Sequence, residues 1–581
     1  MYVATVPNRN SPAAILLRES FRLNGKVNNR TLANLSHWPP AQVDALRSVL
    51  KGATSVATPL PQAFDIVRSR PHGHVAAVLG TLRKLQLDRL IDKRSSRELD
   101  LVVAMIVSRV LEPASKLATS RALHPDTLTS TLGELLHLDS LTEDELYQAM
   151  DWVLPQQARI EQALAKRHFA EGSLVLYDLT STYFEGRHCP LAKLGHPRDD
   201  KKGKLQVVFG LMTNAQGCPV AVEVYAGNTS DPKTVSDQVA KLRQRFGLQR
   251  VILVGDRGMI TSARIRENLK PAPGIEWITA LRAPAIKKLA SGGVLQLSLF
   301  DSRDLAEITH PDFPGERLIA CYNPVLAEER SRKRPELLAA TEKELEKIAV
   351  ATLRKKRPLR GKQNIGLRAG KVLNRYKMGK HFQVQIQDES FSYQRKQANI
   401  EKEESLDGIY VIRTNVPAEA LSSELAVRNY KSLSGVERAF RSLKTVDLHV
   451  RPIHHREPDR VRAHILLCML AYYVEWHMRR DLAPLLFDDD DKAAAEKLRT
   501  SMVTPAQRSA SAQQKVHSKR TEGDLPVHSF QTLLSDLATI VANRVQPKDE
   551  GIPAFDIVTT PTVLQQRALD LLGISLKVPS A

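Results

Sequence analysis

Two short apolar segments of the chain each end on an aspartate. The run SLVLYD at 173–178 ends on Asp178, and the run RVILVGD at 250–256 ends on Asp256. Side chains at the ends of strands in an open α/β sheet project into the crevice where ligands bind. One aspartate in such a place is as often a helix cap or a turn residue. Two of them, on strands that we expect to be neighbours, indicate a shared acidic site.

Glu437 is the candidate for a third acid in that site. The segment 429–444 is predicted to be helical, and Tyr430 and Lys444 lie seven residues before and after Glu437. Because each step of seven residues drifts by only about 20° around a helix, the three side chains should share one face. Arg441, four residues beyond Glu437, could pair with it. The alternative for this helix, taken alone, is a solvated charged stripe.

Three carboxylates in one place suit phosphoryl-transfer chemistry. Hard divalent cations prefer oxygen ligands, and Mg²⁺ usually takes one or two carboxylates together with substrate phosphate. Two such ions about 4 Å apart hold the attacking and leaving oxygens of an in-line displacement. Asp178, Asp256 and Glu437 are therefore candidate ligands for two divalent ions.

The aspartates belong to a segment in which strand and helix patterns alternate. The expected order is β-β-β-α-β-α-β, with strands at 173–178, 204–212, 219–225, 250–256 and 275–280 and helices at 232–246 and 262–269. A turn at 214–217 should join the second and third strands as a hairpin. This order predicts an α/β fold with a mixed sheet.

Composition and pattern divide the whole chain into six regions. We expect a small N-terminal domain with a possible DNA-binding role (1–72), a helical domain with a possible role in recognising DNA ends (73–168), the first part of the α/β core (169–284), an inserted, partly β subdomain with a basic arm (285–421), the second part of the core with the Glu437 helix (422–485), and a linker with a helical tail (486–581). The segment 525–575 of this tail could help the chain to dimerise.

The charge of the chain predicts a polyanionic partner. Lys and Arg number 84 against 64 Asp and Glu, a formal net charge of +20. Nucleic acid is the partner that this excess favours, and binding should weaken steeply with salt. The basic cluster at 354–362 is either a DNA-contacting arm or a solvated helix. A merely basic soluble protein is the alternative to nucleic-acid binding.

Cysteines and histidines show no zinc-site spacing. The four cysteines are scattered without a Cys-x-x-Cys pair, which argues against a zinc ribbon and a disulfide framework and favours a reducing, cytoplasmic compartment. The chain has no secretory signal and no run of about 18 apolar residues. Four neighbouring histidines fit no zinc site and are expected at the surface or on phosphate: His449, His454, His455 and His464.

The segment 430–444 resembles the Y-x2-R-x3-E-x6-K signature of a large family of bacterial insertion-sequence DDE transposases. Tyr430, Glu437 and Lys444 match it in type and spacing, and Leu433 occupies the arginine position. The segments YDLTS (177–181) and VGDRG (254–258) resemble the family's two aspartate strands, and Gly227-Asn228-x-x-Asp231 looks like another of its elements. The resemblance covers roughly residues 170–480.

The resemblance implies an RNase H-like catalytic core with a β-rich insertion between the second aspartate and the glutamate. It implies that Asp178, Asp256 and Glu437 are catalytic and bind two Mg²⁺ ions (Mn²⁺ could substitute), with Asp178 bridging both. The implied partners are double-stranded DNA, as terminal inverted repeats and target, and a second copy of the chain on DNA, in the cytoplasm and nucleoid of a bacterium. The implied DNA contacts are Tyr430, Lys431, Arg441, Lys444 and Arg257.

Two other functions share part of this pattern. One is an RNase H-like nuclease or resolvase that cuts DNA without strand transfer, which the detection of joined target products would exclude. The other is a domesticated DNA-binding protein without catalysis, against which the complete set of three acids argues. Survival of its cellular function in an Asp256→Asn variant would support the second.

Overall fold

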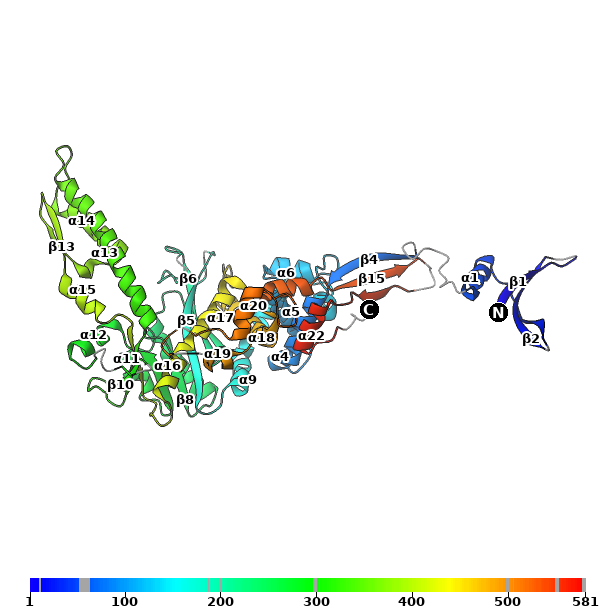
Figure 1. Ribbon diagram of the computed structural model, residues 1–581, viewed down its shortest axis with the longest axis horizontal. Helices are drawn as coiled ribbons and strands as arrows, with labels where there is room; N and C mark the ends of the chain where they lie inside the picture. The colour runs from blue at the N-terminus through cyan, green and yellow to red at the C-terminus, as the bar shows by residue number, and fades with distance from the viewer. Residues whose placement is uncertain are drawn as a thin grey trace.

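The computed structural model describes residues 1–9, 12–23, 25–51, 63–186, 188–198, 201–295, 300–301, 304–497, 499, 501–504, 506–548 and 553–576. The molecule is elongated, with a small β domain at one end, a helical arm at the other and the main sheet with its helices between them (Figure 1).

The main sheet has eight strands in the order β10-β11-β14-β9-β8-β5-β6-β7. Strands β5, β8 and β9 run parallel to one another, whereas β6 and β7 continue the sheet antiparallel beyond β5. The five strands are β5 (Ser173–Tyr183), β6 (Gln206–Asn214), β7 (Pro219–Ala226), β8 (Val251–Val254) and β9 (Ile275–Ala280).

Short helical segments connect these strands. Between β7 and β8 lie η2 (Asp231–Thr234), α10 (Val235–Ala240) and η3 (Lys241–Arg245), and between β8 and β9 lie α11 (Ser262–Arg264) and η4 (Ile265–Leu269). The predicted order β-β-β-α-β-α-β is therefore confirmed, as is the hairpin of β6 and β7. Apolar strands bounded by turn residues had made this segment readable from local pattern.

A layer of helices packs beside β7. It comprises α3 (Gly73–Lys84), α4 (Leu87–Ile91), α5 (Arg97–Leu111), α6 (Lys116–Leu123), α7 (Leu132–Leu135), α8 (Glu143–Val153) and α9 (Gln157–His168). Helix α8 begins with a capping box formed by Thr142 and Glu145. The long helix α18 (Pro458–Asp481) contacts α3, α5, α8 and β7 and is buried on nearly every side, which explains its apolar character.

The inserted region is only partly a separate unit. Its strands β10 (Leu305–Ile308), β11 (Arg317–Tyr322) and β14 (Ile409–Thr414) pair in sequence onto β9 and so extend the main sheet. The prediction of one inserted subdomain over 285–421 is corrected accordingly, because periodicity identifies a strand but not its partner.

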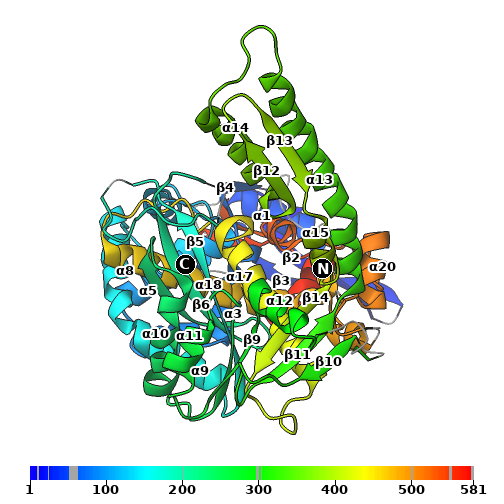
Figure 2. The same ribbon diagram turned by 90° about the vertical axis from the view of Figure 1, so that its left-hand side faces the viewer.

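The arm itself spans residues 324–404 and has a hydrophobic cluster of its own. It projects from the body of the molecule (Figure 2). Its elements are α13 (Pro324–Thr352), α14 (Lys362–Tyr376), the hairpin of β12 (Phe382–Ile386) and β13 (Phe391–Arg395), and α15 (Gln397–Glu404). Helix α12 (Ala283–Ser291) lies outside the arm and precedes β10.

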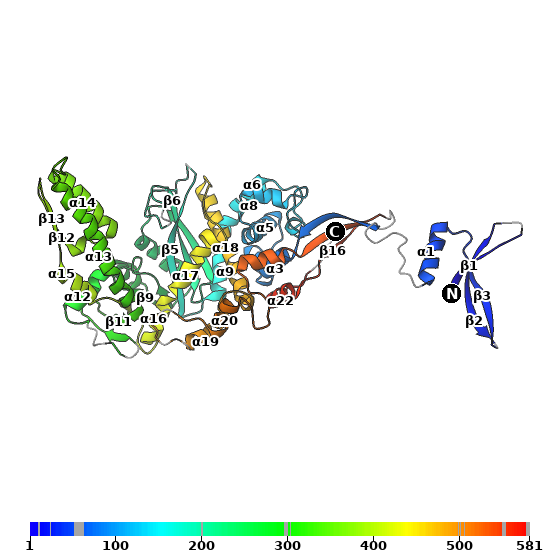
Figure 3. The same cartoon turned by 45° about the horizontal axis from the view of Figure 1, so that its top comes forward.

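A strand that follows the N-terminal domain and two strands of the C-terminal tail form one small sheet. Strand β4 (Phe64–Pro71) pairs with β15 (Val541–Pro547), which pairs with β16 (Phe555–Val558), and this sheet extends away from α3 and α22 (Figure 3). The C-terminal tail, predicted as a linker and helices, therefore also contains strands. Strand β4 lies in the same sheet as these strands rather than in the sheet of the N-terminal domain. The other tail helices are α19 (Lys492–Lys497), α20 (Ala510–Ser518), α21 (Phe530–Leu537) and α22 (Val563–Leu572).

In its described residues, the N-terminal domain has a three-stranded antiparallel sheet and one helix. Its elements are β1 (Tyr2–Val6), β2 (Ala14–Leu23), β3 (Lys26–Asn34) and α1 (Pro40–Leu50). Within the described part of the chain, no helix combines the length and apolar character needed to cross a bilayer.

Candidate active site

Asp178 and Asp256 lie at the same level of the main sheet. β5 and β8 pair in parallel with Leu176 opposite Val254, and each aspartate follows its paired residue by two positions. β5 continues along β6 as far as Tyr183, so Asp178 does not end its strand as predicted. It stands instead where the neighbouring strand β8 has ended, which still places both carboxylates beyond the carboxyl end of β8.

The turn after β8 orients the carboxylate of Asp256. Its Oδ1 accepts hydrogen bonds from the backbone N–H groups of Gly258 (3.0 Å) and Met259 (2.8 Å). The guanidinium of Arg282 donates to the carbonyl oxygens of Arg257 (3.0 Å) and Gly258 (3.2 Å), which holds the turn in place. Because both backbone donors bind Oδ1, they orient the carboxylate without using Oδ2.

Glu437 is carried by α17 (Leu433–Arg441), which packs across β5 and β6. Val436 and Phe440 are buried, and the Phe440 ring meets Phe209 of β6 edge-on at 5.6 Å. Glu437 itself is exposed. The apolar side of the helix thus fixes the height of Glu437 over the sheet, while its carboxylate stays open to solvent.

The predicted single helix over 429–444 is three pieces. α16 (Ser423–Lys431) ends before a turn at Ser432, α17 follows, and η7 (Ser442–Val446) is a π-helix. The change to π-type winding alters the rotation per residue. Lys444, within this π-helix, is buried, whereas Glu437 is exposed.

The three carboxylates interact electrostatically. Burial, followed by the negative charges of Asp256 and Glu437, raises the pKa of Asp178 from 3.8 to about 7. The backbone N–H of Leu179, which donates to Asp178 Oδ1 at 2.8 Å, and the guanidinium of Arg198 act in the opposite direction. The site therefore concentrates more negative charge than the chain itself neutralises.

Tyr430 borders this acidic cluster. Burial, followed by the charge of Asp256, raises the pKa of the Tyr430 phenol to about 12, and Asp178 and Glu437 add to the effect. Arg257 lies close enough to oppose it. The Tyr430 hydroxyl is thus a neutral hydrogen-bond donor at neutral pH.

A buried polar network supports η7 from behind. Ser442 Oγ donates to both carboxylate oxygens of Glu475 on α18 at 3.0 and 2.9 Å. Arg479 donates from Nε to Glu475 (2.6 Å) and from Nη2 to Asp447 (2.9 Å). Because Ser442 and Lys444 belong to the same π-helix, this network sets the position of Lys444 relative to α18.

The other two predicted DNA contacts, Lys431 and Arg441, have different surroundings. The Lys431 ammonium donates to the carbonyl oxygens of Met502 (2.7 Å) and Thr504 (3.0 Å), so it has protein partners in this structure. Arg441 is exposed at the end of α17.

Two further side chains are buried. Trp277 of β9 is 2% exposed and belongs to the core. The prediction that the histidine group lies at the surface is wrong for His464, which is 6% exposed and within 3.1 Å of the Val450 carbonyl oxygen.

Arg198 is a site residue that sequence reasoning missed. Its guanidinium donates to the Leu179 carbonyl oxygen and pairs with Asp231, while its backbone N–H donates to Ser181 Oγ at 3.0 Å. It lies in the loop between β5 and β6, where no periodic pattern exists. The one available signal was the motif that contains Asp231.

Two family models match parts of the chain. A family model for a transposase DDE domain matches residues 173–474, more than half of the 581 residues, and the N-terminal domain of IS1634 family transposases matches residues 3–59. The chain is also similar to a chain in the cryo-EM structure of a piggyBac transposase synaptic complex with hairpin DNA. That similarity has 9% identity and a TM-score of 0.34, and it covers 80% of this chain and 76% of the other. No curated protein matches the chain.

Proposed function

The chain belongs to the DDE transposases, enzymes of DNA transposition that cut DNA and transfer its strands, and from this premise we propose that Asp178, Asp256 and Glu437 are its catalytic carboxylates. The observation that carries the proposal is the mutual electrostatic interaction of these three acids, which come from β5, the turn after β8 and α17. The strand order β7-β6-β5-β8-β9 supports an RNase H-like core.

The donor set fits two Mg²⁺ ions, for which Mn²⁺ could substitute. All donors are carboxylate oxygens. Burial, followed by the charges of Asp256 and Glu437, raises the pKa of Asp178, and a divalent cation would neutralise that negative charge. Asp178 would serve both ions, and Asp256 and Glu437 one each. When bound, the ions supply charge stabilisation at the reacting phosphate and make water or a 3′-hydroxyl more nucleophilic.

Side chains around the acids are suited to hold phosphate oxygens. Tyr430 of α16 offers a neutral hydroxyl donor, and Lys444 of η7 offers a compact positive charge. Arg257, next to Asp256, and the exposed Arg441 extend the positive surface. Binding by these groups positions the scissile phosphate for in-line attack.

The arm provides a further DNA contact. Its loop between α13 and α14 carries Arg354, Lys355, Lys356 and Arg357, all exposed. Exposed cations on a projecting element bind the phosphate backbone of DNA without reading its sequence. We assign this loop to contacts with DNA outside the cleavage site. We also propose that two copies of the chain act together, one at each end of the element.

The test is cleavage of labelled duplexes that carry the terminal repeats flanking the coding sequence, with Mg²⁺. Wild type should nick the end and join it to a target plasmid, and Glu437→Gln should lose at least about 100-fold in rate while still binding DNA. Glu267→Gln, at a surface glutamate paired with Arg264, is the matched control and should behave as wild type.

Each alternative outcome identifies another function. Equal cleavage by wild type and Glu437→Gln would overturn the catalytic assignment. Nicked ends that are never joined would favour a nuclease, and specific binding without any cleavage would favour a domesticated DNA-binding protein.

A further inference from the structure

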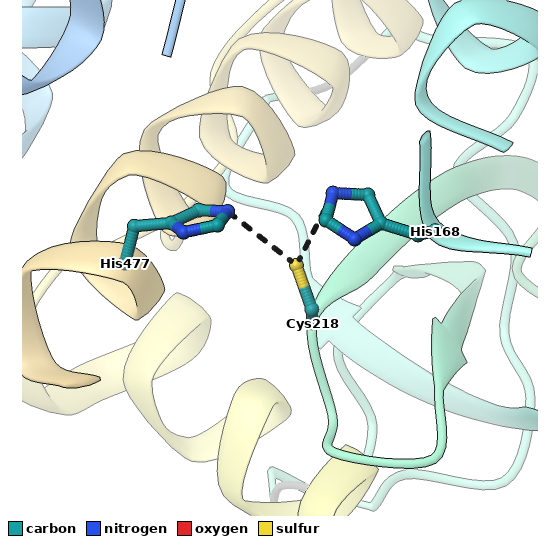
Figure 4. A group of neighbouring side chains, drawn as sticks. All are labelled: His168, Cys218 and His477. Atoms are coloured by element: carbon teal, nitrogen blue, oxygen red, sulfur yellow. Dashed lines mark hydrogen bonds between the residues drawn. The ribbon is translucent and has the colours of Figure 1, made fainter. Parts of the chain in front are cut away.

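A cluster of two histidines and a cysteine lies at the junction of three elements (Figure 4). Cys218 Sγ is 3.9 Å from Nε2 of His168 and 4.0 Å from Nε2 of His477, and one ligand atom of each residue lies within 4.8 Å of the other two. His168 ends α9, Cys218 precedes β7 and His477 lies on α18. β7 is the far edge strand, two strands away from β5 with its catalytic carboxylate.

The three side chains are held rigidly by their surroundings. Cys218 is fully buried and His477 is 6% exposed. The N–H of Cys218 donates to Asn214 Oδ1 at 3.0 Å, which fixes the turn that carries the thiol. The two histidines belong to packed helices, so little conformational entropy remains to be lost when the three groups bind a common ligand.

We propose that His168, Cys218 and His477 together bind one zinc ion, at a site that has no part in phosphoryl transfer. Tetrahedral zinc, with bonds of about 2.3 Å to sulfur and about 2.0 Å to nitrogen, places a sulfur about 3.5 Å from each nitrogen. The observed 3.9 and 4.0 Å are within small side-chain rotations of that value. Thiolate and imidazole ligands select zinc over magnesium.

The neighbouring groups are compatible with an ion at this position. Oη of Tyr473 lies 3.0 Å from Nε2 of His168 and accepts a hydrogen bond from Arg167 at 3.1 Å. Two guanidinium groups near the cluster have partners of their own. Arg480 pairs with Asp481 at 2.8 Å, and Arg167 donates to the Leu85 carbonyl oxygen at 2.7 Å.

Binding would form a Zn–S bond as the thiol proton of Cys218 leaves to solvent, with no change of oxidation state. The ion would join the helical layer, the β6–β7 hairpin and α18 through one centre. Because α18 also holds Ser442 through Glu475, the centre would stabilise the scaffold behind the active site.

Metal analysis of the full chain, purified without chelators, tests the proposal. We expect one zinc per chain in wild type and a loss of at least about tenfold in Cys218→Ser. Cys468→Ser is the matched control, because Cys468 is also buried and 3.9 Å from a histidine, His464, yet belongs to no three-ligand group in the described part of the chain. It should retain the full zinc content.

Cobalt substitution gives a readout that does not depend on a variant folding. Co²⁺-loaded wild type should show a thiolate-to-cobalt charge-transfer band and the strong visible bands of tetrahedral cobalt, and His168→Asn should weaken both. Absence of the charge-transfer band in wild type, or equal zinc content in wild type and Cys218→Ser, would overturn the proposal. Both outcomes leave the carboxylate site untouched, since it contains no sulfur ligand.

Discussion

Metal binding at the carboxylate site should depend steeply on pH because one ligand holds a proton near neutrality. With a pKa of about 7, Asp178 is ionised in about half of the molecules at pH 7 and in about one hundredth at pH 5. A divalent ion must displace that proton. Lowering the pH from 8 should therefore weaken Mn²⁺ binding about tenfold by pH 6 and about 100-fold by pH 5.

Titration of the full chain with Mn²⁺, followed by electron paramagnetic resonance between pH 5 and pH 8, measures this dependence. Glu267→Gln, which changes a carboxylate outside the cluster, should reproduce the wild-type curve. Asp178→Asn should bind Mn²⁺ weakly at every pH. An affinity for wild type that stays constant from pH 6 to pH 8 would refute the reasoning, because the proton on Asp178 would then be absent.

The same proton affects stability in the absence of metal. The pKa of Asp178 is 3.8 in its unperturbed state and is raised to about 7 in the folded chain, so protonation of this carboxyl stabilises the folded state. This stabilisation is fully present below pH 3.8 and is lost as the pH rises through about 7. Each tenfold change in proton affinity corresponds to about 1.4 kcal/mol, so the loss by pH 8 is at most about 4 kcal/mol. Asp178→Asn should thus melt above wild type at pH 8 in EDTA and approach it at pH 5. Equal melting temperatures at pH 8 would contradict the assigned burial and repulsion.

Three further predictions concern the surroundings of the site. Ser442→Ala removes the hydroxyl that donates to buried Glu475 and should lower the free energy of unfolding by about 1–3 kcal/mol. It should also slow cleavage, and Ser442→Thr should restore the wild-type rate. Unchanged cleavage in Ser442→Ala would argue against a positioning role. Replacing Arg354, Lys355 and Lys356 by Ala should lower the slope of log binding constant against log salt by up to about 3, with cleavage at saturating DNA retained; an unchanged slope would remove the arm loop from the DNA surface. Leu433→Arg restores the signature residue but places a charge at a position that is 9% exposed in the core, so the melting temperature should fall; unchanged melting with faster cleavage would show that an arginine is accommodated there.

The local sequence pattern was sufficient to predict the strands and helices of the part of the fold that holds Asp178 and Asp256. Alternation of apolar strands with turn residues reports burial and backbone conformation within one segment, and this gave the strand and helix order of 173–280. Motif spacing identified Glu437, although the π-helical turn at Ser442, which contains the buried Lys444, was invisible to a uniform helical repeat.

Pairings between distant segments were decided only by the tertiary structure. Ser69 of β4 meets Asn543 of β15 across 474 residues, and Cys218 meets His168 across 50 residues and His477 across 259. A periodic pattern states that a residue is buried but not against what, because the partner depends on how whole elements pack. Scattered cysteines and histidines therefore argued against a zinc site by spacing, whereas the fold brings three of them together. The three acids proposed to be catalytic were readable from the sequence because each stands beside a motif of its own.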